Sequence, residues 1–335
     1  MSVYGDRSGA FSLQGPRRSN EDWAAILALD DRRKLACLAD GMGGHGGGEI
    51  ASRTAIATLE RELMCGAALG DAVRLANEAV CFESDRDGCE GMGTTLVAVL
   101  RDGGRFEVAN VGDSRAYWLD GSGITRLTVD HSFVTEAVRN GALSPQEAER
   151  SPFKHVLLRA VGPKLEVDVD LFGPYEVNAA GAVLLCSDGL HGTLQDEEIR
   201  AAALQTSAPL EAARVLAELA VARGTPDNVT VAILEFGLLF EGKAPAAASL
   251  RGPAPDAVAA ASAPSAPARD MAAQPSAALP PASRAGRARP ILASSEAVRP
   301  RRSWPRGLSL DAFAWLSVVS GFLIWLVVTL LVAIR

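Results

Sequence analysis

The chain has 335 residues, of which 48% are hydrophobic and 22% charged, and this balance excludes a mostly disordered or collagen-like protein. Its five cysteines lack CxxC spacing, so they indicate neither a disulfide framework nor a zinc cluster, and we expect a reducing compartment. The net charge of −7 argues against a nucleic-acid partner.

Residues 1–242 have the mixed composition of a globular domain, with 22 Lys or Arg and 36 Asp or Glu. Short apolar runs bounded by turn residues predict strands at Trp23–Leu29, Lys34–Ala39, Thr94–Leu100, Phe106–Val111, Arg115–Leu119, Val167–Phe172, Ala182–Cys186 and Val229–Phe236. Apolar residues at helical spacing predict helices at Glu49–Met64, Leu69–Glu83, Asp196–Leu204 and Leu210–Arg223.

The order of these elements predicts an α+β fold. Three strands follow one another through residues 94–119 with short turns between them, which favours antiparallel pairing over crossover connections. Strands grouped apart from helices indicate layered α+β architecture. The region Phe133–Lys154 has no clear period, and we interpret it as a helical insertion that forms a mobile flap over the substrate.

Residues 243–306 are expected to form a linker. They hold eleven of the 18 prolines and carry ten Lys or Arg against three acids. Segments of this composition do not bury a core and act as extended spacers. Seven arginines cluster between Arg284 and Arg306, which favours a basic segment facing anionic lipid.

Residues 307–335 are expected to hold a membrane anchor. Residues 312–334 form 23 consecutive uncharged, mostly apolar positions, which as a helix of about 1.5 Å per residue would span a bilayer core. The arginines precede this segment, so the positive-inside rule places residues 1–306 in the cytoplasm. We therefore expect a single-pass protein of the inner (cytoplasmic) membrane.

Acidic residues stand at the ends of several predicted strands. Asp40 ends an apolar run and enters a stretch with six glycines in ten residues, and Asp188 ends another run before a glycine. Carboxylates that converge without Lys or Arg repel one another, and divalent cations relieve this repulsion. Oxygen-only ligands favour Mg²⁺ or Mn²⁺ over zinc, and two such ions suit hydrolysis of a phosphoryl group.

An ordered series of motifs over residues 8–236 resembles the metal-dependent protein Ser/Thr phosphatases, the protein phosphatase 2C or PPM family, in its bacterial form. The series comprises Arg17-x-x-Asn20-Glu21-Asp22, Asp40-Gly41-Met42-Gly43-Gly44-His45, Gly93-Thr94-Thr95, Gly112-Asp113-Ser114-Arg115, Asp130-His131-Ser132, Arg159-Ala160-Val161-Gly162, Ser187-Asp188-Gly189-Leu190 and Asp227-Asn228-Val229-Thr230. The resemblance implies a four-layer αββα sandwich of two antiparallel sheets flanked by helices, with the metal site in a cleft between the sheets.

The resemblance also implies roles for individual residues. Metal-site roles fall on Asp40 as the bridging ligand, the Gly41 carbonyl, Asp188 and Asp227, on Asp113 for a third ion, and on Glu21 and Asp22 as acids that hold metal-bound water. Arg17 would bind the substrate phosphate, because a guanidinium fork suits its oxygens. His45 would act as the general acid that protonates the leaving oxygen. His131, His155 and His191 are interpreted as structural or surface residues, and Cys186 as a core residue.

The implied activity is hydrolysis of phosphoserine or phosphothreonine in proteins by direct attack of a metal-bridging hydroxide, with two or three Mn²⁺ or Mg²⁺ ions. A cognate Ser/Thr protein kinase is the expected counterpart, phosphorylated proteins are the expected substrates, and the membrane is contacted through the C-terminal helix. Two alternatives remain open: a catalytically weak phosphoprotein-binding scaffold, and a phosphatase dedicated to one regulatory partner.

Overall fold

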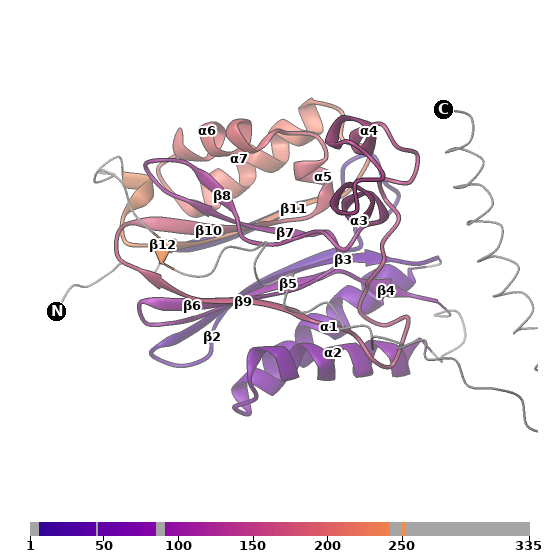
Figure 1. The fold of residues 1–335 in the computed structure, drawn as a ribbon. Helices are drawn as coiled ribbons and strands as arrows, with labels where there is room; N and C mark the ends of the chain where they lie inside the picture. The colour runs from indigo at the N-terminus through magenta and orange to yellow at the C-terminus, as the bar shows by residue number, and fades with distance from the viewer. Residues whose placement is uncertain (1–6, 45, 85–90, 242–249, 252–335) are drawn as a thin grey trace, which may run out of the picture. The chain divides into compact units, whose positions relative to one another are not determined.

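Two antiparallel sheets lie face to face at the centre of the described domain (Figure 1). The computed structural model describes residues 7–44, 46–84, 91–241 and 250–251, all within the first of the chain's two units, Met1–Pro267. His45, most of the predicted linker and the whole predicted anchor at 312–334 lie outside the described residues. No helix in the described part of the chain is both long and apolar enough to cross a membrane.

The first sheet has five strands in the order β1-β11-β10-β7-β8, and every neighbouring pair is antiparallel. Its strands are β1 (Ser8–Leu13), β11 (Val229–Phe236), β10 (Gly181–Cys186), β7 (Arg115–Leu119) and β8 (Ile124–Arg126). The strands β1 and β11 are therefore neighbours although more than 200 residues separate them, which brings the start of the domain against a late strand.

The second sheet has seven strands in the order β12-β9-β6-β5-β3-β2, with β4 paired to the end of β3. Its strands are β12 (Leu250–Arg251), β9 (Asp170–Val177), β6 (Arg105–Val111), β5 (Leu96–Asp102), β3 (Arg33–Met42), β2 (Asp22–Ala28) and β4 (Gly93–Thr94). The two-residue β12 lies inside the predicted linker and pairs with β9.

Helices cover the outer face of each sheet, which confirms the expected αββα sandwich (Figure 1). The seven-stranded sheet is covered by α1 (Gly47–Met64) and α2 (Leu69–Glu83). The five-stranded sheet is covered by α5 (Asp188–His191), α6 (Asp196–Leu204) and α7 (Pro209–Ala222). The expected flap region contains two short helices, α3 (Phe133–Arg139) and α4 (Pro145–Glu149), and a single turn of 3₁₀ helix, Leu239–Glu241, follows β11.

The strand prediction placed one strand wrongly and missed three others. The strand expected at 167–172 begins only at Asp170, which pairs with Asn110 of β6, and it continues to Val177. Val167 and Val169 alternate as in a strand, but they pack on the core beneath α1 and α2 without a ladder partner. The strands β1, β8 and β12 were not predicted, because β1 is rich in Ser and Gly, β8 has only three residues and β12 only two.

Both faces of the central strands are buried, which explains their continuous apolar runs. Along β7, Tyr117 faces the core under the helices, and Trp118 faces the core between the sheets. An aromatic cluster fills the inter-sheet core, with Phe106 in contact with Trp118, Tyr175 and Phe236 at ring-centroid distances of 5.1–5.8 Å. Cys186 is fully buried in the helix-side core, as expected.

Replacing the central ring of this cluster is expected to weaken the whole sandwich. Phe106→Ala should lower the free energy of unfolding by about 3–5 kcal/mol, because it removes buried apolar surface and leaves a cavity among three other rings. Urea denaturation measures the change. The control Phe82→Ala removes a ring that is 64% exposed and should cost less than about 0.5 kcal/mol. Equal losses in the two variants would contradict the assigned core.

Candidate active site

A cleft of about 1330 Å³ opens where strand ends of the two sheets meet, and it collects most of the predicted site residues. Seven of the nine line it: Arg17, Glu21, Asp40, Gly41, Asp113, Asp188 and Asp227. Asp22 is 5% exposed and does not line the cleft; its carboxylate accepts a hydrogen bond from the hydroxyl of Ser187 at 2.8 Å. The remaining predicted residue, His45, lies outside the described residues.

Asp40 is positioned by its own backbone. It lies near the end of β3, where its N–H donates to Thr95 Oγ1 at 2.9 Å. Its carbonyl accepts from the N–H of Thr95 and from the hydroxyl of Thr94, both at 2.9 Å. The two threonines of the Gly93-Thr94-Thr95 motif thus hold the main chain of the central acid on both sides.

Close packing of glycines brings Glu21 and the start of α1 to the same place. A Cβ on Gly41 would lie 2.2 Å from the carbonyl oxygen of Gly48 and 2.6 Å from that of Glu21. A Cβ on Gly48 would lie 2.2 Å from Glu21 Oε2. Any side chain at either position would push the Glu21 carboxylate and the Gly41 carbonyl apart.

Asn228, which also lines the cleft, joins three segments of the chain. Its side-chain oxygen accepts from the N–H of Glu21 at 3.0 Å, and its amide donates to the carbonyls of Gln14 and Ser19 at 2.7 and 2.9 Å. A Cβ on Gly189 would lie 1.9 Å from the Asn228 carbonyl oxygen, so α5 approaches this point closely. Asp188, which begins α5, and Asp227 are thereby brought to one place.

Arg17 reaches into the cleft from the turn between β1 and β2. Its guanidinium donates to Asp227 Oδ2 at 2.5 Å and to the Pro226 carbonyl at 3.1 Å, and its side chain is 55% exposed. The guanidinium therefore lies among the acids and is open to a ligand that enters the cleft.

The acids of the cleft are poorly compensated. Burial raises the pKa of Asp40 well above its ordinary value, and the nearby Asp22, Asp188 and Asp113 raise it further. Burial also raises the pKa of Asp22 and of Asp113 to about 7, with Asp188 adding to both. Asp188 differs, because contacts with His155 and His191 outweigh its burial and lower its pKa.

This donor set fits divalent cations. One oxygen of Asp188 and one of Asp22 are buried without a hydrogen-bond partner, and such an oxygen is costly unless something binds it. All the candidate ligands are oxygens, which suits Mn²⁺ or Mg²⁺. No three His, Cys, Asp or Glu side chains among the described residues already stand as close as in a formed metal centre.

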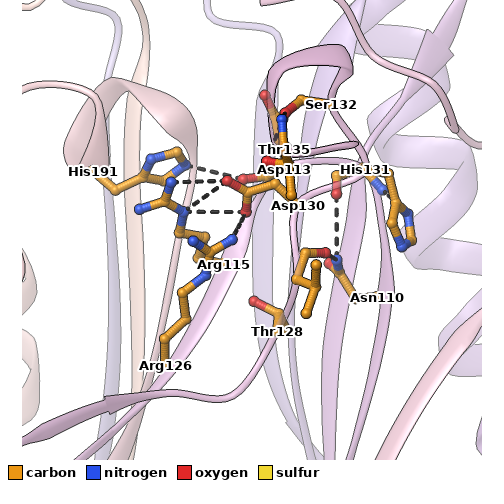
Figure 2. A network of polar contacts seen from close by, with 12 residues as sticks. Asn110, Asp113, Arg115, Arg126, Thr128, Asp130, His131, Ser132, Thr135 and His191 are labelled. Carbon is orange, nitrogen blue, oxygen red and sulfur yellow. Dashed lines mark hydrogen bonds and ion pairs between the residues drawn. The ribbon is translucent and has the colours of Figure 1, made fainter. Parts of the chain in front are cut away.

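A network of hydrogen bonds and ion pairs holds the turn that contains Asp113 (Figure 2). Asp130 accepts hydrogen bonds from Arg115 at 2.8–3.2 Å and also pairs with Arg126. His191 Nε2 donates to the Asp113 carbonyl at 3.0 Å, and His131 Nδ1 accepts from the Gly112 N–H at 3.1 Å. These contacts fix the turn that presents the Asp113 side chain to the cleft.

His155, which the sequence analysis interpreted as structural or surface, lies beside a predicted metal ligand. It lines the cleft from the segment after α4, and its Nδ1 lies 3.4 Å from Asp188 Oδ2. The hydrogen bond with Asp188 raises the pKa of His155. No motif around residue 155 signals this contact, because it depends on how the segment between α4 and Arg159 folds over the cleft.

The raised pKa of Asp22 predicts that the free energy of unfolding of the metal-free protein depends on pH. The folded chain holds a proton that the unfolded chain releases between pH 3.8 and about 7, so the stability falls as the pH rises through this window. Asp22→Asn keeps an acceptor for Ser187 and removes this cost. In EDTA its free energy of unfolding should exceed that of the wild type at pH 8 by on the order of 1–4 kcal/mol, and the difference should vanish near pH 4.

Urea denaturation at a series of pH values measures this difference. The matched control Asp31→Asn alters a carboxylate on the exposed turn between β2 and β3 and should follow the wild-type curve. An Asp22→Asn variant that is no more stable than the wild type at pH 8 would show that the Asp22 carboxylate carries no such penalty.

The sequence of this chain is similar to those of several known proteins. The family model for protein phosphatase 2C matches residues 17–222, more than half of the chain. The serine/threonine protein phosphatase PstP of Mycobacterium tuberculosis is 38% identical over 239 residues, which are 68% of this chain and 45% of that protein. The chain thus matches about half the length of the mycobacterial relative.

Two further comparisons cover almost the whole of the matched chain. The serine/threonine phosphatase stp of Listeria monocytogenes is 34% identical over 68% of this chain and 94% of its own length. The crystal structure of the catalytic domain of PstP in complex with two manganese ions is 38% identical, with a TM-score of 0.59 over 69% of this chain and 98% of that one. This chain therefore belongs to the protein phosphatase 2C family.

Proposed function

We propose that this protein is a metal-dependent protein serine/threonine phosphatase. The observation that carries the proposal is the gathering of Asp40, Asp113, Asp188 and Asp227 around one open cleft that also holds the Arg17 guanidinium. Acids of this kind suit divalent ions, and a cation at the rim suits a phosphate group. The named relatives are serine/threonine phosphatases, which supports the same substrate class.

Asp40, the Gly41 carbonyl, Asp188 and Asp227 would hold two divalent ions, with Asp113 available to a third. When bound, such ions activate water at neutral pH and neutralise charge on a transferring phosphoryl group. The relative crystallised with two manganese ions supports Mn²⁺ for this chain, and Mg²⁺ suits the same oxygens. Glu21 stands beside the Gly41 carbonyl, where it would orient water.

Arg17 would bind the substrate phosphate. Its guanidinium pairs with Asp227, and a phosphate that enters the cleft offers it two or three acceptor oxygens in place of one carboxylate. Holding the phosphate at a fixed point aligns phosphorus for in-line attack. We propose that His45 delivers a proton to the leaving oxygen of serine or threonine, a role that suits an imidazole at neutral pH.

Loss of one of the acids that would hold the ions should strongly reduce turnover. We expect Asp40→Asn and Asp188→Asn to lower Mn²⁺-dependent phosphate release from a phosphothreonine peptide by at least about a hundredfold, because an amide binds a divalent ion far more weakly than a carboxylate. Phosphate release with and without Mn²⁺ is the measurement. Asp31→Asn, on an exposed turn outside the cleft, should match the wild type.

Three other outcomes would change the proposal. Near-normal rates in both acid variants would contradict the metal assignment. Phosphopeptide binding by the wild type with no release under any metal would favour a phosphoprotein-binding scaffold. Release from one protein out of a broad phosphoprotein panel would favour a phosphatase dedicated to a single regulatory partner. Release from many would support a general counterpart of a Ser/Thr kinase.

We also propose that residues 312–334 anchor the protein in the cytoplasmic membrane, with the phosphatase domain in the cytoplasm. The support is the length of this uncharged apolar segment and the arginines that precede it. The full chain is expected in the membrane fraction and should leave it only with detergent, whereas a chain ending at Arg306 should be soluble. Immunoblots of fractionated cells measure this, and full-length protein in the soluble fraction would contradict the anchor.

A further inference from the structure

One side of the cleft is formed by a segment that has no role in the proposed metal binding, phosphate binding or proton transfer. We define residues 162–168 as the cleft wall. It begins after Val161, whose N–H and carbonyl exchange hydrogen bonds with Thr94 at 2.8 and 2.9 Å, and it leads into β9. Five of its residues line the cleft: Pro163, Lys164, Glu166, Val167 and Asp168.

The wall lines the cleft with three charged residues, and valines attach it to the core. Val167 and Val169 pack on the core beneath α1 and α2. Glu166 and Asp168 alternate with these valines, and Lys164 lies on the bend that precedes them. All three charged residues are exposed and line the cleft, so together they form one strip of charge along the wall.

The charges of this strip are free for a ligand. None of the side chains of Lys164, Glu166 and Asp168 forms an ion pair or hydrogen bond with another residue in the ranges that the structure describes. They are also distinct from the acids of the proposed metal site, which lie at the ends of strands and at the start of α5. A strip of unpaired charges along an active cleft is suited to contacting the chain on either side of a phosphorylated residue.

The backbone of the wall is held from behind by a single buried side chain. Asn77 lies on α2 and is 1% exposed. Its amide nitrogen donates to the carbonyls of Lys164 and Leu165 at 2.9 and 2.8 Å, and its oxygen accepts from the N–H of Gly162 at 2.8 Å. Gly162 has φ +107°, and a Cβ there would lie 2.5 Å from Val80 of α2, so the wall approaches the helix as closely as glycine permits.

We propose that Asn77 is a positioning residue for substrate binding, which holds the cleft wall as a preformed surface for the peptide around the phosphorylated residue. The inference rests on the proposed phosphatase function and adds to it a separate peptide-contacting surface. A surface ordered before binding loses less conformational entropy when a peptide settles on it. Because the strip carries two carboxylates and one ammonium, it favours peptides with a basic side chain near the phosphorylated residue.

The first test separates peptide binding from chemistry. In the full-length protein, Asn77→Ala should raise KM for a phosphothreonine peptide about three- to tenfold, because three hydrogen bonds that order the wall are lost. KM for p-nitrophenyl phosphate, which is too small to reach along the wall, should change less than about twofold. The control Val183→Ala removes buried packing from β10 in the core between the sheets, away from the cluster on which the wall packs, and should alter neither KM.

The second test does not depend on a buried substitution. Glu166→Gln combined with Asp168→Asn should lower kcat/KM for an arginine-flanked phosphothreonine peptide about three- to tenfold relative to the same peptide with glutamine in place of arginine. The control pair Asp31→Asn and Glu107→Gln makes the same change of net charge on exposed positions outside the cleft and should leave that ratio at its wild-type value.

The outcomes distinguish this inference from the proposed function. Wild-type hydrolysis of both substrates supports the phosphatase, whatever the variants do. Equal changes in KM for peptide and p-nitrophenyl phosphate in Asn77→Ala, or none, would overturn the positioning role. An unchanged peptide ratio in the carboxylate variant would overturn the charge preference of the wall. No hydrolysis by the wild type would instead overturn the proposed function on which the inference rests.

Discussion

Repulsion between buried carboxylates is the constraint on which the rest of this structure depends. Asp40, Asp113, Asp188 and Asp227 come from four distant parts of the chain and meet around one cleft. Burial and mutual repulsion raise the pKa of Asp40 and of Asp113, so the metal-free site opposes its own ionised form. Groups in such a position spread apart unless their backbones are fixed by interactions that do not involve the carboxylates.

The fixing interactions are neutral and mostly made by main chain. Thr94 and Thr95 hold the backbone of Asp40, while Asn228 joins the turn before β2 to the start of β11. Gly189 lets α5 pack directly on the Asn228 carbonyl. Behind these contacts, two sheets buried on both faces supply the rigidity, since a strand such as β7 cannot shift without disturbing two cores. The fold therefore holds the acids close together, and bound cations would relieve the repulsion between their carboxylates.

Not every buried acid in the molecule is left uncompensated. Asp130 is as buried as the cleft acids, yet Arg115 and Arg126 outweigh its burial and lower its pKa (Figure 2). His131 and Arg159 do the same for Asp170 at the start of β9. The contrast separates two uses of a carboxylate: paired acids hold the Asp113 turn and the strand next to the cleft wall, and unpaired acids remain available to a ligand.

The sequence alone indicated an α+β fold and five of the acids that line the cleft, and the ordered motif series indicated the family and its sandwich, because apolar runs, strand-end aspartates and motifs are local features. Contacts between distant segments decided the rest. Ser-rich β1 is a strand because of its ladder with β11. Val167 and Val169 pack on the core and form no strand, because the ladder with β6 starts at Asp170. Two contacts leave no local signal in the sequence: that of His155 with Asp188, and the hydrogen bonds of Asn77 with residues 162–165. Each joins segments that are distant in the sequence, the second across about 85 residues, so it depends on packing that no single segment encodes.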